Sequence, residues 1–170
     1  HEPDAVLIFE PVEEGTGDNG SNHEVTLYFR PLAGRDTAEF YADARYGEFW
    51  VGPRPTLKEF SERYGLRTRD LSELEVAITK NAGNQGLGGV NIRLVRNVDP
   101  AVDALVDTSR YNTGVELEQA DKLDSELAVA LSEARLIKDA IEVENLQRSV
   151  DMTVKGFEEV IRSLPKAKEH

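Results

Sequence analysis

The chain has 170 residues, no cysteine and a formal net charge of −12 at pH 7. A chain of this length can bury a core without disulfide bonds, and the lack of cysteine excludes disulfide scaffolds and cysteine-based zinc or redox sites. No uninterrupted apolar run is longer than five residues, whereas a membrane span needs about 20. Nor does the chain open with a basic and apolar leader. These features predict a soluble, cytoplasmic protein without a membrane partner.

The negative charge is concentrated at the two ends of the chain. Residues 1–29 hold seven acidic and no basic residues, residues 30–115 hold twelve of each, and residues 116–170 hold thirteen acidic and eight basic residues. A nucleic-acid backbone is recognised by clustered Lys and Arg. We therefore expect no nucleic-acid partner, and we interpret the acidic ends as solvated surface.

The start of the sequence is unlike that of a chain as it is first translated. Its only methionine is Met152, and it opens with His1-Glu2-Pro3-Asp4. We therefore expect a processed product or a fragment of a longer protein.

The first 30 residues predict two strands. Residues 5–9 (AVLIF) form a continuous apolar run, which is typical of a buried strand. Residues 12–23 are polar and rich in Gly and Asn, so they favour a turn or an exposed loop. Residues 24–30 (EVTLYFR) alternate and carry β-branched and aromatic side chains. We expect a second strand there, antiparallel to the first.

Three helix-start patterns follow, each with an N-cap residue and an acidic residue three positions later. The pairs are Asp36 and Glu39, Thr56 and Glu59, and Asp70 and Glu73. In such capping boxes the side chains satisfy backbone N–H groups that have no partner within the helix. The patterns predict short helices near residues 37–45, 57–64 and 71–79.

The next segment predicts a strand and another helix. Residues 81–90 (NAGNQGLGGV) are rich in glycine, but the expected order is helix, loop, strand and no Gly-Lys-Ser/Thr follows, so a connector is favoured over a phosphate-binding loop. Residues 90–95 (VNIRLV) predict a strand. Asp99 and Pro100 are a typical N-cap and first-turn pair for a helix that ends near Ser109.

The last third of the chain predicts two long helices, at 121–136 and 139–164, where strong helix formers dominate. Apolar residues of the second helix recur every three or four positions and so form one stripe. They are Val143, Leu146, Val150, Val154, Phe157, Ile161 and Leu164. We expect Pro165 to end this helix, and we expect a partner chain or a further domain to cover the stripe.

The sequence contains no recognisable catalytic or metal-binding constellation. Its histidines are His1, His23 and His170, and none stands in a zinc-binding spacing. No serine lies in a Gly-x-Ser-x-Gly elbow. We therefore assign no catalytic residue, no metal ligand and no cofactor to this chain.

The segment 48–54 (EFWVGPR) contains the only tryptophan, Trp50, and a nearby arginine, Arg54. Two interpretations are open. Trp50 is either a core anchor beside a Gly-Pro turn, or it forms an exposed contact surface with Arg54, because Trp and Arg are enriched at binding hot spots.

Separate segments of the sequence resemble one family, the Xaa-Pro aminopeptidases, also called aminopeptidase P. The opening HEPDAVLIF resembles a strand start of that family's N-terminal domain, and EFWVGPR matches its Glu-x-Trp-x-Gly-x-Arg signature. The matching signature residues are Glu48, Trp50, Gly52 and Arg54. Near the C-terminus, EARLIKDAIEVE resembles the linker into the pita-bread catalytic domain of the creatinase and prolidase superfamily. That match rests on Arg135, Ile137, Lys138, Glu142 and Glu144.

The resemblance implies an α/β fold with a small mixed β-sheet flanked by helices, followed by long C-terminal helices. It implies an N-terminal domain over residues 1–115 that lacks its first strands, a helical linker over 116–138, and the first helix of a truncated catalytic domain over 139–170.

The implied parent enzyme is a hydrolase that removes the N-terminal residue from peptides with proline in second position. Members of the family hold two divalent metal ions, commonly manganese, with two Asp, one His and two Glu of the catalytic domain. None of those ligands is expected in this chain, which we expect to be inactive alone. The implied partners are its own catalytic domain, other subunits of a homo-oligomer, and the peptide substrate.

The resemblance also implies a role for the aromatic residues. In tetrameric bacterial members, aromatic residues of the N-terminal domain approach the active site of a neighbouring subunit. We expect Trp50 to do so together with Arg54, and Tyr41 is a weaker candidate because residues 41–47 look like extra length relative to the family pattern. Two alternatives stay open: a pita-bread protein that has lost its metal ligands and serves as a binding module, and a prolidase, which takes only dipeptides.

Overall fold

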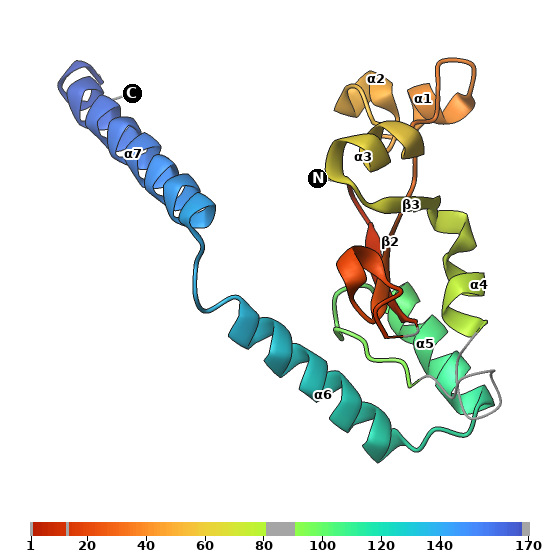
Figure 1. The fold of residues 1–170 in the computed structure, drawn as a ribbon. Helices are drawn as coiled ribbons and strands as arrows, with labels where there is room; N and C mark the ends of the chain where they lie inside the picture. The colour runs from red at the N-terminus through yellow and green to blue at the C-terminus, as the bar shows by residue number, and fades with distance from the viewer. Residues whose placement is uncertain (1, 13, 81–90, 168–170) are drawn as a thin grey trace. The chain divides into compact units, whose positions relative to one another are not determined.

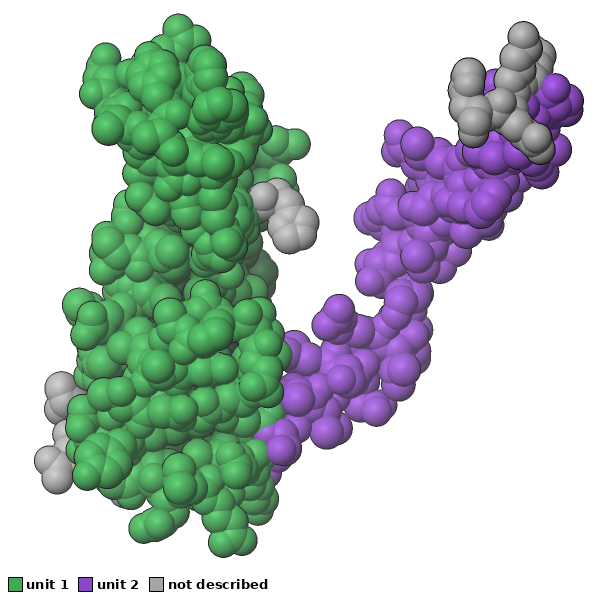
Figure 2. Space-filling view, turned by 180° about the vertical axis from the view of Figure 1, so that it is seen from behind, with its two compact units in different colours: residues 1–124 green, residues 125–170 purple. Residues whose placement is uncertain are grey.

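A computed structural model describes residues 2–12, 14–80 and 91–167 of the chain. The chain divides into two compact units, residues 1–124 and residues 125–170 (Figure 2). The division lies inside a helix that runs through both ranges. The domain boundaries at residues 115 and 138 stay predictions.

Unit 1 contains a mixed sheet with the strand order β1-β2-β3 in its described residues (Figure 1). Strand β1 (Val6–Pro11) pairs antiparallel with β2 (His23–Phe29), as predicted. The connection between them contains one short 3-10 helix, η1 (Asp18–Gly20). Strand β3 (Arg67–Asp70) pairs parallel with β2 and was not predicted, because its sequence RTRD has no apolar residue. The predicted α/β fold with a small mixed sheet is therefore confirmed.

The two faces of the sheet pack against different helices. Tyr28 of β2 is buried with Leu74 of helix α4 (Leu74–Thr79) and with Val102 and Val106 of helix α5 (Pro100–Asn112). Both helices lie beside the strands in Figure 1. Phe29 points to the opposite face and is fully buried, and its ring lies 5.1 Å from that of Phe60. The alternation of side chains along a strand produces this division.

The prediction that the first strand is buried is wrong for half of its residues. Leu7 and Phe9 are 45% and 59% exposed, whereas Val6 and Ile8 pack against the core cluster. Among the described residues β1 pairs with β2 alone, so it is an edge strand there. Its continuous apolar run therefore has one face turned to the core and one turned away from it.

Three short helices follow β2: α1 (Ala38–Ala42), α2 (Glu48–Val51) and α3 (Leu57–Tyr64). The predicted capping box of α3 is confirmed, with both Thr56 and Glu59 making their reciprocal hydrogen bonds. The cap predicted at Asp36 is wrong, because Thr37 accepts the hydrogen bond from the backbone N–H of Phe40. The carboxylate of Glu39 is 2.6 Å from the guanidinium of Arg30 instead.

The helices after β3 begin as predicted but with different details. The 3-10 helix η2 (Leu71–Glu73) precedes α4 (Leu74–Thr79), and the side chain of Asp70 accepts from the backbone N–H of Ser72. Glu73 does not complete a capping box, because it forms an ion pair with Arg69. Helix α5 (Pro100–Asn112) begins with the predicted cap, Asp99.

The strand predicted at 90–95 is not formed by the described residues 91–95. Ile92 and Leu94 do turn toward the core, which explains the alternating pattern. Their backbone groups, however, bond to side chains: the carbonyl of Ile92 accepts from Arg110 at 2.7 Å, and the N–H of Leu94 donates to Asp124 at 2.8 Å. The predicted glycine-rich connector at 81–90 lies outside the described residues.

Asp124 is the centre of a buried ion-pair cluster where helix α6 (Leu117–Ala134) meets the rest of unit 1. Its two carboxylate oxygens accept from Arg110 at 2.6 and 2.8 Å, and one also accepts from Arg96 at 2.7 Å. The side chains of Asp124 and Arg110 are each 5% exposed. The cluster thus joins α6, α5 and the segment that contains Leu94.

Unit 2 contains the rest of α6 and helix α7 (Ala140–Ser163), which ends in the 3-10 helix η3 (Leu164–Lys166). The long C-terminal helices are thereby confirmed. Asp139 and Glu142 form a complete capping box at the start of α7. Every residue of the predicted apolar stripe is at least half exposed. No helix among the described residues is long and apolar enough to cross a membrane.

Replacing Asp124 by Asn should lower the free energy of unfolding at pH 7 by about 3–5 kcal/mol, because two arginines would lose their buried counter-charge. Burial raises the pKa of Asp124, but hydrogen bonds from Arg110, Arg96 and the backbone of Leu94 lower the pKa by more, so the net shift is downward. The ionised Asp124 carboxylate therefore stabilises the fold above the unfolded-state pKa of about 4. That contribution is lost as the pH falls through the lower folded-state pKa.

Urea unfolding between pH 7 and pH 2 measures both effects. Asp121→Asn, on the exposed side of the same helix, is the matched control and should behave as wild type. Equal unfolding free energies for the two variants would contradict the assignment.

Candidate functional site: an exposed aromatic surface

Three aromatic side chains of unit 1 form a cluster that faces solvent. Tyr41, Phe49 and Trp50, here called the aromatic surface, are 54%, 60% and 62% exposed. The rings of Tyr41 and Phe49 are 6.0 Å apart, and those of Phe49 and Trp50 meet edge to face at 5.1 Å. The indole Nε1 of Trp50 donates to the carbonyl of Tyr41 at 2.7 Å. Trp50 is therefore a surface residue, and its interpretation as a core anchor is wrong.

The α2 turn presents Phe49 and Trp50 because glycines fix both of its ends. At Gly47 a Cβ atom would lie 2.5–2.6 Å from the carbonyl oxygens of Glu39, Phe40 and Asp43, so no larger residue fits. Gly52 has φ +84° and ψ −177°, a backbone conformation that is essentially restricted to glycine. Between these two points the chain makes one helical turn.

The side chains of Glu48 and Arg54 attach this turn to the backbone of the segment that follows strand β2. The carboxylate of Glu48 accepts from the backbone N–H of Ala33 at 2.7 Å. The guanidinium of Arg54 donates to the carbonyls of Tyr46 at 3.1 Å and Pro31 at 3.5 Å, and also to the carbonyl of Arg30. Both side chains thus reach back from the turn to residues that follow β2.

Arg54 does not lie on the aromatic surface. Its side chain is 5% exposed and forms an ion pair with Glu2 at 3.2 Å, while its guanidinium stacks over the ring of Tyr46. The hypothesis that Arg54 is an exposed contact residue beside Trp50 is therefore corrected by its burial. Of the four signature residues, Glu48, Gly52 and Arg54 hold the turn, and Trp50 alone is exposed.

The two N-terminal segments that carry the family resemblance meet in space. Glu2 pairs with Arg54, and Asp4 accepts hydrogen bonds from both Arg45 and Tyr46. Sequence reasoning missed Glu2, Asp4 and Tyr46 as partners of the turn, because these contacts span more than 40 positions. The sequence did carry one signal for a contact site in this region, the high density of aromatic residues between positions 40 and 50.

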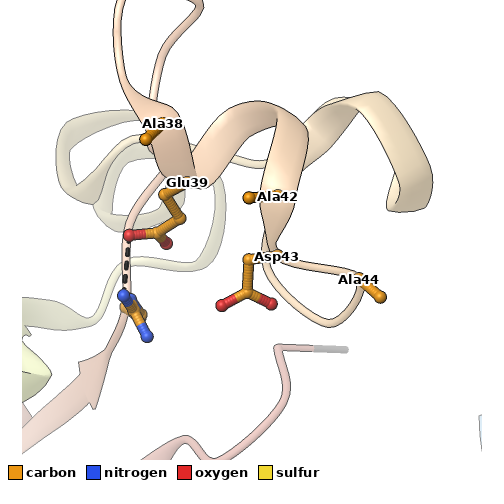
Figure 3. Close-up of a pocket in the computed structure, with 6 residues that line it drawn as sticks. Ala38, Glu39, Ala42, Asp43 and Ala44 are labelled. Atoms are coloured by element: carbon orange, nitrogen blue, oxygen red, sulfur yellow. Dashed lines mark hydrogen bonds and ion pairs between the residues drawn. The ribbon is translucent and has the colours of Figure 1, made fainter.

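An open depression of about 440 Å³ lies at α1. Arg30, Glu39 and Asp43 line it together with three alanines, Ala38, Ala42 and Ala44 (Figure 3). Glu39 and Asp43 both direct carboxylates toward this space, and the dashed line marks the ion pair of Glu39 with Arg30. The guanidinium of Arg30 pairs with Glu39, and one carboxylate oxygen of Asp43 accepts from the backbone N–H groups of Arg45 and Tyr46. Both acidic groups of the depression therefore already have partners within unit 1.

The described residues contain no group of three or more His, Asp or Glu side chains that could hold a metal ion. They therefore do not fit a divalent metal centre, and we assign no reaction step to them. The aromatic surface is instead suited to contact, since large rigid rings with a polar edge are enriched at interfaces.

Comparison with known proteins gives consistent matches. The chain is 37% identical over 164 residues to Xaa-Pro aminopeptidase 1 of Streptomyces coelicolor and equally to that of Streptomyces lividans. It is 35% identical over 164 residues to Xaa-Pro aminopeptidase 2 of Streptomyces coelicolor. These matches cover 96% of the chain but 28–30% of the relatives.

The resemblance to the Xaa-Pro aminopeptidases is thereby confirmed over nearly the whole chain. No family model matches the chain, and no solved structure matches it.

Replacing Gly52 by Ala should destabilise unit 1 by about 1–3 kcal/mol, because a Cβ atom is strained in this backbone conformation. Thermal unfolding followed by circular dichroism measures the loss. Gly156→Ala, in the middle of α7 where nothing lies within 4 Å of an added Cβ, is the opposite-sign control and should raise helix content. A Gly52→Ala variant as stable as wild type would show that the turn adopts a different conformation.

Proposed function

We propose that the chain is part of a metal-dependent Xaa-Pro aminopeptidase, a hydrolase that releases the N-terminal residue from peptides with proline in second position. In this proposal the 170 residues serve subunit association and access to the active site, not chemistry. The similarity over 96% of the chain to proteins of that name is the observation that carries it. The chain spans less than a third of the length of these relatives, so the activity is proposed for the whole enzyme.

The catalytic metal pair, two divalent ions that are commonly manganese in such enzymes, is assigned to a part of the enzyme outside these residues. The described residues contain no group of three or more His, Asp or Glu side chains that could hold it. We also expect the enzyme to act in the cytoplasm.

The aromatic surface is the proposed contact site of this part of the enzyme. Trp50 and Tyr41 are each more than half exposed, and the hydrogen bond from the indole of Trp50 to the carbonyl of Tyr41 holds the indole in place. A ring that is already ordered loses little conformational entropy when it binds. We propose that the surface contacts another subunit of a homo-oligomer and helps to enclose the short peptide substrate near that subunit's active site.

Burial of Trp50 against a neighbouring subunit would make it a hot spot. Truncation of such an anchor costs about 2 kcal/mol or more, which corresponds to roughly a 30-fold change in an equilibrium constant. In the full-length enzyme, Trp50→Ala should weaken the oligomer or lower kcat/KM for an Xaa-Pro tripeptide by that order. Analytical ultracentrifugation and steady-state kinetics measure the two effects.

Tyr64→Ala is the matched control, because Tyr64 is a similarly exposed aromatic residue, 53%, on α3. It should change neither property. The 170-residue chain alone is expected to hydrolyse nothing, and its hydrolysis of an Xaa-Pro peptide would contradict the division of roles. Full-length enzyme that cleaves no Xaa-Pro peptide would favour a non-catalytic binding module, and cleavage of dipeptides only would favour a prolidase.

A further inference from the structure

Arg54 is a buried cation that closely follows three exposed apolar residues, Phe49, Trp50 and Val51. Its side chain is 5% exposed, and that of its carboxylate partner Glu2 is 11% exposed. An arginine stays charged when buried, so it requires a counter-charge and hydrogen-bond acceptors. In the described part of the chain, Glu2 is the one carboxylate paired with it, and the remaining contacts are backbone carbonyls and an aromatic ring.

The contacts of Arg54 close a loop around α2. Tyr46 precedes this helical turn and Arg54 follows it, and the hydrogen bond from the guanidinium to the Tyr46 carbonyl joins the two ends of the loop. A single isolated turn of helix is unstable in water. The loop that presents Trp50 therefore depends on this closure and on the attachment of Glu48 to Ala33.

The segment that contains Glu2 fixes the closed loop to the rest of unit 1. Asp4, two residues further on, contacts Arg45 and the hydroxyl of Tyr46, and the Tyr46 ring lies 4.6 Å from the Arg30 guanidinium and 5.2 Å from that of Arg54. Two carboxylates, those of Glu2 and Asp4, thus contact the closed loop and its N-terminal flank. Each lies more than 40 positions from its partner along the chain.

We propose that Glu2 and Arg54 form a positioning pair that sets the orientation of Trp50. The pair itself does not contact substrate. It holds the loop 46–54 closed, and the loop presents the indole. Its consequence for catalysis rests on the proposed function, in which Trp50 contacts a neighbouring subunit or the substrate.

The single tryptophan of the 170-residue chain provides a direct readout of this pair. Glu2→Gln keeps the size of the side chain but removes the counter-charge, and Arg54→Lys keeps the charge but cannot reach the same set of carbonyls. Both variants should shift Trp50 emission to longer wavelength and increase its quenching by acrylamide, while the far-ultraviolet circular dichroism of the chain stays unchanged. Glu62→Gln, which removes an exposed ion pair with Lys58 on α3, should leave Trp50 emission as in wild type.

The positioning pair would be overturned if Glu2→Gln had the same emission maximum and quenching constant as Glu62→Gln. This holds whatever emission Arg54→Lys shows. In the full-length enzyme Glu2→Gln should lower kcat/KM for an Xaa-Pro tripeptide, by up to about 100-fold, because small misplacements of substrate-enclosing groups cost that much. Trp50→Ala combined with Glu2→Gln should lose no more than Trp50→Ala alone.

The two proposals fail in different ways. If Glu2→Gln shifts the emission while Trp50→Ala changes neither turnover nor assembly, the positioning pair stands and the proposed role of Trp50 fails. If Trp50→Ala lowers turnover while Glu2→Gln leaves the emission unchanged, the role of Trp50 stands and the positioning pair fails.

Discussion

The burial of the Arg54 guanidinium is the constraint on which the aromatic surface depends. A charged group that is 5% exposed must be compensated locally, and here the compensation comes from Glu2 and from backbone carbonyls on both sides of the α2 turn. Because the guanidinium is planar and presents several donors in fixed directions, it can hold several chain segments at once. The exposed position of Trp50 is a consequence of that arrangement, since the residues around it are committed to holding the turn.

The same principle acts at the other end of unit 1, with the charges reversed. There a single carboxylate, Asp124, is buried between Arg110 and Arg96 and also accepts from a backbone N–H. Each cluster links segments that are distant in the sequence, and neither relies on apolar burial alone. Among the described residues of this unit, Phe29 and Val106 are the largest fully buried side chains.

The elements that could be predicted from the sequence are those set by local signals. Thr56 with Glu59, Asp99 before Pro100, and Asp139 with Glu142 satisfy neighbouring N–H groups, and each marks the start of a helix. Strand β3 was missed because its residues are polar and its pairing with β2 is non-local. Residues 91–95 alternate like a strand, but their backbone groups bond to Arg110 and Asp124, which no local pattern reveals.

The candidate site was predictable only in part, because local sequence signals do not show its non-local contacts. The family resemblance singled out the signature residues of the segment 48–54, yet it did not show which of them faces solvent. Composition suggested that Trp50 and Arg54 act together at a surface, because both residue types are common at interfaces. The structure separates them, since the Arg54 side chain is buried and pairs with Glu2, which lies 52 positions away. Burial of this kind depends on tertiary contacts, so the spacing of residues in the sequence does not predict it.

A double-mutant cycle between Glu2 and Arg54 tests the central claim most directly. The free energies of unfolding of the 170-residue chain would be measured for wild type, Glu2→Gln, Arg54→Met and the double variant, because each single change removes one of the two charges. A buried, directly contacting pair should give a coupling energy of about 0.5–3 kcal/mol, so that the double variant loses less than the sum of the single losses. Losses that add within about 0.3 kcal/mol would show that the two residues act independently and would contradict the account.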